Sequence, residues 1–181
     1  GSFSGVTDPM TVANFDLQGG TFTAPASLSI SGSWDRSGDA SFDPGSSSTI
    51  VYFTGMTTLN DNTTTFYYTD IGGAVVLNSE LHTGYMQIQN GGTLDANGFD
   101  VYDAGSWWNS GTFTSGGGAQ TVHFNGYGNI TNGLNHFNHI EITGAAELQG
   151  DVYIDGNWTN NGGSVTANSY QTYFTGTTTL T

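Results

Sequence analysis

Hydrophobic and polar residues alternate along this chain in short stretches. Four stretches of five or six residues show the pattern clearly and are rich in β-branched and aromatic residues: 49–54, 85–89, 121–125 and 151–155. Gly, Asn, Asp or Ser separates such stretches, which is typical of β-strands joined by tight turns. No window holds a sustained 3.6-residue stripe, and the helix-favouring residues Lys, Arg and Glu are almost absent. The pattern therefore predicts an all-β protein.

One motif, Gly-x-Trp-x-x-[Ser/Asn]-Gly, occurs three times, at 32–38, 105–111 and 156–162. A Phe-x-Gly follows each tryptophan after 16 to 19 residues, at Phe53, Phe124 and Phe174. The tryptophans are 73 and then 51 residues apart. This spacing predicts repeat units at roughly 12–63, 64–135 and 136–181, with an extra turn of about 22 residues in the middle unit around Tyr85–Asp103.

Two all-β architectures compete for this pattern. An antiparallel sandwich would use the Asn-Gly pairs at 97–98, 125–126 and 132–133 as hairpin turns. A parallel β-solenoid would bring the same landmarks back at regular coil intervals, with like residues stacked on like. The threefold return of Trp, Phe and Gly favours a solenoid of about seven to eight coils of roughly 22 residues. Antiparallel pairing of 49–54 with 64–69 would contradict it.

The repeat phrases resemble a known family. The stretch from Gly156 to Ala167, its Phe174-Thr-Gly continuation and the phrase Phe137-Asn-His-Ile-Glu-Ile142 resemble the Gly/Asn/Thr-rich repeats of large secreted surface adhesin proteins of Bacteroidetes-type bacteria. The resemblance covers most of 12–181. It implies a right-handed parallel β-helix that forms stalk or adhesive regions outside the cell. Asp35-Arg36 departs from the Thr-Asn that is usual in the repeat.

Charge and composition exclude several functions. Fifteen carboxylates against one cation give a net charge of −14, which repels nucleic acid. The absence of lysine excludes a P-loop and a Schiff base, and the absence of cysteine excludes disulfides and thiolate metal sites. No apolar run approaches the roughly 20 residues of a membrane-spanning helix, so no membrane insertion is expected.

Four tryptophans divide into two environments. Trp34, Trp107 and Trp158 share one repeat position, which favours an internal aromatic stack over a sugar-binding platform. Trp108 neighbours Trp107, so on a strand it faces the other way, to the outside.

An outer ring stripe is a second expectation. Tyr52, His123 and Tyr173 each precede a repeat phenylalanine and should face outward on related coils, either as simple cross-coil packing or as a binding surface. Trp108, Tyr52 and Tyr173 are therefore the candidate ligand-binding residues, with a glycan or another surface ligand as the partner.

Carboxylates suggest a metal site. Asp35, Asp39 and Asp43 are four residues apart in a polar segment beside Arg36, and calcium favours clustered oxygens. Turn formation explains the same residues without an ion. A second acidic cluster comprises Asp95, Asp100 and Asp103. No cofactor other than calcium is suggested.

Catalysis is not expected. Local motifs assemble neither a Ser-His-Asp triad nor a His-Glu-x-x-His site. Enzymatic β-helices of the pectate-lyase type use Arg or Lys as the base, and here only Arg36 exists. We therefore expect a non-catalytic structural or adhesive segment of an extracellular bacterial surface protein. The alternative is a carbohydrate-binding module of a secreted polysaccharide-active protein.

Both chain ends carry an expectation. Gly1-Ser2 resembles a cloning scar, so the solenoid domain is expected to span 3–181 as a fragment of a longer repeat protein. The repeat spacing leads us to expect that the last coil ends within a repeat unit, without a capping segment. Unpaired backbone groups at about 163–181 are therefore expected to support end-to-end self-association.

Overall fold

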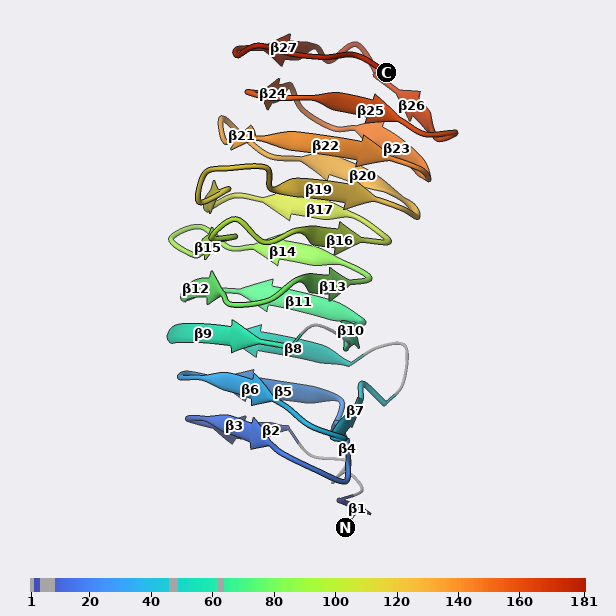
Figure 1. The fold of residues 1–181 in the computed structure, drawn as a ribbon. Coiled ribbons are helices and arrows are strands. Elements are labelled where there is room, and N and C mark those ends of the chain that lie inside the picture. The colour runs from blue at the N-terminus through green and yellow to red at the C-terminus, as the bar shows by residue number, and fades with distance from the viewer. Residues whose placement is uncertain (1, 4–8, 46–48, 62–63) are drawn as a thin grey trace.

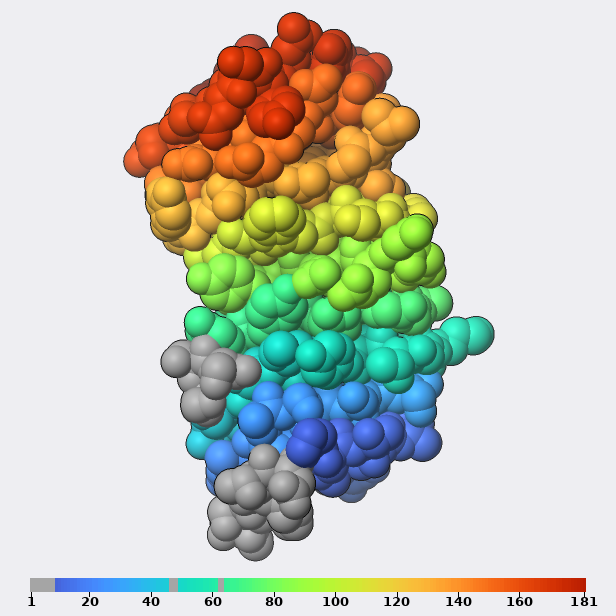
Figure 2. Space-filling model, turned by 180° about the vertical axis from the view of Figure 1, so that it is seen from behind, coloured from blue at the N-terminus to red at the C-terminus, as the bar shows by residue number. Residues whose placement is uncertain are grey.

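The structure, a computed structural model, describes residues 2–3, 9–45, 49–61 and 64–181. Gly1 of the expected scar and the expected unit boundary at 63 lie outside this part of the chain. The described residues form 27 short strands and no helix, and hence no helix long and apolar enough to cross a membrane. Figure 1 shows the strands stacked in turns from the N-terminal to the C-terminal end, and Figure 2 shows the same stack from behind.

Each turn contributes up to three strands, which build three faces along the stack. The first face is one nine-stranded sheet. Its strands are β2 (Met10–Val12), β5 (Ser27–Ile30), β8 (Ile50–Phe53), β11 (Tyr68–Ile71), β14 (Met86–Ile88), β17 (Trp107–Asn109), β20 (Tyr127–Thr131), β23 (Ala145–Leu148) and β26 (Ser164–Thr166).

The second and third faces each consist of a six-stranded and a three-stranded sheet. The second face has β3 (Phe15–Leu17), β6 (Trp34–Arg36), β9 (Met56–Asn60), β12 (Ala74–Leu77), β15 (Thr93–Asp95) and β18 (Thr112–Thr114), then β21 (His136–Phe137), β24 (Val152–Ile154) and β27 (Thr172–Phe174). The third face has β1 (Ser2–Phe3), β4 (Thr21–Thr23) and β7 (Ser41–Asp43), then β10 (Thr65–Phe66), β13 (Leu81–Thr83), β16 (Val101–Asp103), β19 (Thr121–Phe124), β22 (His139–Ile142) and β25 (Trp158–Asn160).

The parallel β-solenoid is confirmed, with about eight turns. β8 pairs in parallel with β5 and β11, so the antiparallel alternative for 49–54 is excluded. Turn length follows from one inward row of the first face, in which each residue is the register partner of the next: Met10, Leu28, Val51, Thr69, Met86, Trp107 and Ile130. These partners are 17 to 23 residues apart, so several turns are shorter than the predicted 22 because loop length at the corners varies. The right-handed winding stays a prediction from the resemblance.

Inward positions of all three faces form one continuous hydrophobic core. Alternation along each short strand places every second side chain inside. The core is organised around the repeat tryptophans. Trp34 packs edge-on against Phe42 and Phe66, with ring centroids 4.9 and 5.0 Å away, and Trp107 packs edge-on against Phe113 at 5.1 Å. Each repeat therefore builds its own aromatic cluster.

The three copies of the repeat motif lie on three different faces. Trp34 is on β6 of the second face, Trp107 on β17 of the first and Trp158 on β25 of the third. From β17 to β25 the chain advances eight strands, a third of a turn short of three full turns. From β6 to β17 it advances eleven, a third short of four. Each repeat is thus rotated by a third of a turn, so the predicted single tryptophan stack is wrong, although the interior position of Trp34 and Trp107 is confirmed.

The extra turn of the middle unit is where the spacing predicts it. Strands β14, β15 and β16 run from Met86 to Asp103 and contribute one strand to each face. This full turn has no counterpart between Trp107 and Trp158. Because it is a whole turn, it leaves the one-third rotation between repeats unchanged.

The Phe-x-Gly motif has a steric cause. A β-carbon on its glycine would lie far too close to a backbone oxygen of the preceding turn: 2.1 Å at Gly55, 1.7 Å at Gly126 and 1.8 Å at Gly176. Only glycine lets the backbones of successive turns approach this closely at the corner. The motif therefore marks corners at which the backbones of successive turns are in close contact.

Candidate ligand-binding face

One outward row of the first face holds two of the three ring residues predicted from sequence. Tyr52, Asp70, Gln87 and Trp108 are consecutive register partners on β8, β11, β14 and β17. Each lies beside an inward residue of its strand, so alternation turns it away from the core, although Asp70 is only 8% exposed. We call these four residues the outer row. Three strand spacings separate its end residues, or about 14 Å.

Two more tyrosines border the outer row. The Tyr68 and Tyr85 rings stack with centroids 6.0 Å apart and 18° between their planes. The Tyr68 hydroxyl donates a hydrogen bond to Gln87 Oε1. Gln89 Nε2 donates to Asp70 Oδ2 at 2.9 Å. These contacts fix the polar side chains of the row between its two ends.

Burial perturbs two titratable groups here. It raises the pKa of Asp70, and the hydrogen bond from Gln89 offsets only part of that effect. Burial, followed by the nearby Asp70 and Tyr52, also raises the pKa of Tyr68. Tyr68 therefore keeps its proton and remains a hydrogen-bond donor over a wide pH range.

Trp108 is exposed, whereas Tyr52 is half-buried. Trp108 is 46% exposed, which confirms its predicted outward direction. Its register partners are Gln87 and Thr131, and within the part of the chain that the structure describes neither Trp108 nor Tyr52 stacks on another ring. The exposed indole of Trp108 can stack on the apolar face of a sugar ring, and the Gln87 amide on the neighbouring strand can hydrogen-bond the sugar hydroxyls.

The predicted stripe of Tyr52, His123 and Tyr173 does not form. The one-third rotation places Tyr52 on the first face, His123 on the third and Tyr173 on the second. Equivalent sequence positions therefore point in three directions. Tyr173 lies outside the outer row.

His123 and Tyr173 belong instead to two ring ladders. On the third face His82, Tyr102 and His123 stack at 4.4 and 4.3 Å, with planes within 5° of parallel. On the second face His136, Tyr153 and Tyr173 stack at 5.2 and 5.0 Å. Stacked rings cover each other's faces, so the ladders present mostly ring edges to a ligand. Alternation and parallel register could have predicted these ladders only once the turn lengths were known.

Carboxylates line the third-face ladder. Glu141 Oε2 lies 2.7 Å from His123 Nδ1, and Asp100 Oδ2 lies 3.4 Å from His123 Nε2. The hydrogen bond with His123 holds the pKa of Glu141 below its usual range. Burial, with help from the surrounding carboxylates, raises the pKa of Tyr102. The ladder is thus a cross-turn network that ties β13, β16, β19 and β22 together.

The three aspartates of the expected calcium site occupy separate places. Asp35 is on β6 and accepts a hydrogen bond from Asn60 at 3.1 Å. Asp39 is exposed in the following turn. Asp43, on β7, accepts from the backbone N–H of Gly45 at 2.9 Å, as a turn-forming aspartate does. Among the described residues, no three His, Asp or Glu side chains group closely enough to hold a metal ion.

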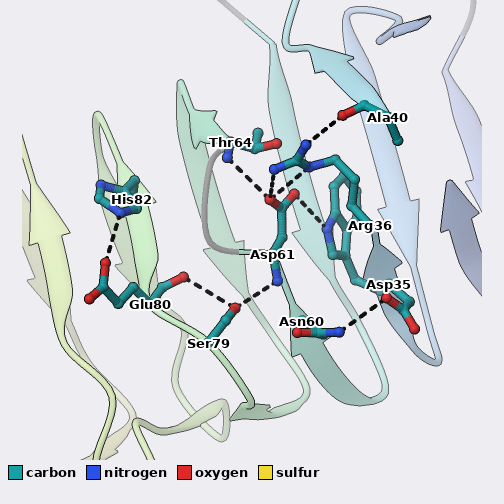
Figure 3. A network of polar contacts seen from close by, with 10 residues as sticks. Asp35, Arg36, Ala40, Asn60, Asp61, Thr64, Ser79, Glu80 and His82 are labelled. Carbon is teal, nitrogen blue, oxygen red and sulfur yellow. Dashed lines mark hydrogen bonds and ion pairs between the residues drawn. The ribbon is translucent and has the colours of Figure 1, made fainter. Parts of the chain in front are cut away.

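The only arginine is part of a buried network (Figure 3). Arg36 Nη2 lies 2.6 Å from Asp61 Oδ1, with both side chains almost fully enclosed. Trp34 Nε1 donates to Asp61 Oδ2 at 3.0 Å, and the Thr64 N–H donates to Oδ1 at 3.1 Å. Burial would raise the pKa of Asp61, but the hydrogen bonds from Arg36, Thr64 and Trp34 outweigh it and hold that pKa below its usual value. Arg36 therefore stabilises the buried Asp61 carboxylate that also binds the Trp34 indole.

The second acidic cluster also separates. Asp100 faces outward to His123, whereas Asp103 points into the core and is 1% exposed. Asp95 accepts the Asn97 N–H in a turn at 2.9 Å. No shared ion site is formed by these three side chains.

No family model, curated protein or solved structure matches this chain. The likeness to surface adhesin repeats therefore remains an expectation from the motifs of the sequence.

Proposed function

We propose that this chain is a non-catalytic structural and adhesive segment of an extracellular bacterial surface protein, and that it contacts glycans through the outer row. The observation that carries the glycan contact is the pairing of two unstacked rings, Trp108 and Tyr52, in one row with Asp70 and Gln87 between them. The location outside a bacterial cell rests on the resemblance of the repeat motifs.

Two features support a structural rather than a catalytic role. The stack gives length with a continuous core and repeated corner glycines, as an extended spacer requires. Arg36, the one side chain that could serve as the base of a lyase-type β-helix, is bound to Asp61 inside the fold. Its guanidinium is therefore unavailable to a substrate at the surface.

A carbohydrate-binding module of a secreted polysaccharide-active protein is the second candidate. The same exposed face of Trp108 favours it, because such modules bind through surface aromatic rings. The two candidates differ in ligand: an adhesin segment should select soluble or surface glycans, whereas the module should bind insoluble cellulose or chitin.

A glycan array together with cellulose and chitin pull-downs tests both. We expect wild type to bind at least one ligand, Trp108→Ala to lose about tenfold or more in affinity, and Tyr170→Ala to bind as wild type does. Tyr170 is a matched control because it is 40% exposed and lies in the loop between β26 and β27, away from the outer row. Retention on cellulose or chitin that depends on Trp108 would favour the module. No binding to any ligand would leave a passive structural segment and reject the glycan contact.

A further inference from the structure

In all three repeat clusters, the tryptophan ring and the phenylalanine ring of the Phe-x-Gly motif are arranged in nearly the same way. The tryptophan and the Phe-x-Gly phenylalanine lie 6.3 Å apart at 76° in the first repeat, 6.2 Å at 82° in the second and 6.4 Å at 79° in the third. The pairs are Trp34 with Phe53, Trp107 with Phe124, and Trp158 with Phe174. The third cluster is therefore built on the same template as the first two.

A further phenylalanine fills the first two clusters. Phe66 lies 5.0 Å from Trp34, and Phe137 lies 5.5 Å from Trp107, and both are fully buried. At the third cluster the corresponding space is a pocket of about 390 Å³ lined by Trp158, Thr172, Phe174, Leu180 and Thr181. Its lining residues lie on β25, on β27 and at the end of the chain, and Figure 1 shows both strands at the C-terminal end of the stack.

The third cluster also lacks, among the described residues, the hydrogen-bond acceptor that the first two clusters provide for the tryptophan indole. Asp61 accepts the Trp34 indole N–H, and Asn132 accepts that of Trp107, each at 3.0 Å. Both acceptors precede their filling phenylalanine by five residues. Within the described chain the indole N–H of Trp158 has no such partner.

The backbone at this end is also partly unpaired. Leu180 is the register partner of Trp158, just as Leu59 and Ile130 are partners of Trp34 and Trp107. Leu180 is 63% exposed, whereas Leu59 and Ile130 are buried. β26 and β27 pair with a described strand on one side only. An incoming strand would thus find both an apolar pocket and free backbone groups.

We propose that this pocket is the acceptor site for a β-strand segment of the same repeat, carrying an Asn or Asp followed five residues later by an aromatic residue. The aromatic ring would take the place that Phe66 and Phe137 take, and the amide or carboxylate would accept the Trp158 N–H. The inference does not depend on the proposed glycan contact.

The N-terminal turn of a second copy fits this site less well. The phenylalanine that fills each cluster lies on a different face in each repeat: Phe66 is on the third face and Phe137 on the second. By the same one-third rotation, the aromatic residue that fills the third cluster belongs on the first face, on a strand stacked above β26. There the N-terminal turn would offer Met10 and Val12 of β2 and no aromatic ring. The expected end-to-end self-association is therefore an alternative that the test must separate.

The test adds a peptide with the sequence of Asn132–Ile142 to the full chain and follows the Trp158 indole N–H by NMR. The signal is assigned by its loss in Trp158→Phe. We expect a saturable shift of the Trp158 signal at up to about millimolar peptide, with the buried Trp34 and Trp107 signals unchanged. The matched peptide with Phe137→Ala should bind about tenfold or more weakly.

A second variant tests the pocket without changing Trp158 itself. Leu180→Asp places a charge at the pocket wall, and we expect it to weaken the peptide by a similar factor while the other indole signals stay in place. Equal shifts with both peptides, or no shift with either, would overturn the proposal. A Trp158 shift that depends on protein concentration without peptide would identify a second copy as the occupant and would also overturn it.

Discussion

Asp103 places a carboxyl group in the interior, at a position where the other two repeats have Ile30 and Ile154. Its Oδ1 accepts only the Gly105 N–H at 3.2 Å, and its Oδ2 has no partner. Burial raises the pKa of Asp103 to about 7, with the Gly105 hydrogen bond offsetting part of the effect. An uncompensated carboxyl group in an apolar slot should penalise the fold when it ionises.

The pH dependence of stability follows from this shift. Below about pH 4 the group is protonated in both states; between about 4 and 7 the unfolded chain releases the proton while the folded chain keeps it, so stability falls as pH rises. Above about pH 7 the loss is complete, at about 4 kcal/mol. Asp103→Asn should flatten this slope and be the more stable protein at pH 8.

Urea unfolding at pH 4, 6 and 8 measures the effect of Asp103→Asn. Asp39→Asn, in an exposed turn, controls for the loss of one negative charge. Parallel pH profiles for wild type and Asp103→Asn would show that Asp103 ionises without cost in the folded state, contrary to our account.

Asp61 is the opposite case, a buried carboxylate with partners. Asp61→Ala leaves the Arg36 guanidinium enclosed without its counter-charge, and we expect it to cost about 3–5 kcal/mol. Asp35→Ala removes one partly exposed hydrogen bond from Asn60 and should cost about 1 kcal/mol. The comparison is made by denaturant unfolding at neutral pH. Similar losses for both variants would mean that the network in Figure 3 contributes no more than a surface contact.

At the scale of elements, close stacking of turns depends on the corner glycines. Gly126→Ala would force a β-carbon to within 1.7 Å of a backbone oxygen, so β19 and β20 must separate from the turn below. We expect a loss of about 3 kcal/mol or more. Gly19→Ala is the matched control, because nothing lies within 4 Å of the added carbon. Thermal unfolding with an unchanged midpoint for Gly126→Ala would contradict the steric explanation of the Phe-x-Gly motif.

The sequence allowed us to predict which segments form strands and which of their side chains point inward. It did not allow us to predict which of the three faces of the solenoid each strand belongs to. Period-two alternation gave the outward direction of Trp108 and the inward direction of Trp107, because alternation is local. The face occupied by Tyr52, His123 or Tyr173 depends on the number of strands between them. Since that number is eight or eleven rather than a multiple of three, equal motif positions diverge by a third of a turn.

The partners within the candidate site were missed for the same reason. Asp70 and Gln87 lie between Tyr52 and Trp108 only because successive turns differ in length, and no motif marks either residue. The expected calcium cluster failed to assemble in the described residues because Asp35 and Asp43 lie on strands of different faces. Sequence proximity is a poor guide in a fold whose chain turns a corner every few residues.

At the scale of the whole molecule, the stack sets the distance between functional groups. Two rings at opposite ends of the outer row, about 14 Å apart by strand spacing, can act together only on a ligand long enough to reach both. The distance between the two rings would thereby make binding depend on the length of the ligand. This links the architecture directly to the proposed glycan contact.

The most direct test is the affinity of wild type and Tyr52→Ala for oligosaccharides of increasing length, taken from a glycan that binds through Trp108. We predict a step in wild-type affinity, about tenfold, at the length that first spans the outer row. In Tyr52→Ala that step should be absent while binding of shorter oligosaccharides is unchanged. The same length dependence in both proteins, or no step in wild type, would contradict the account.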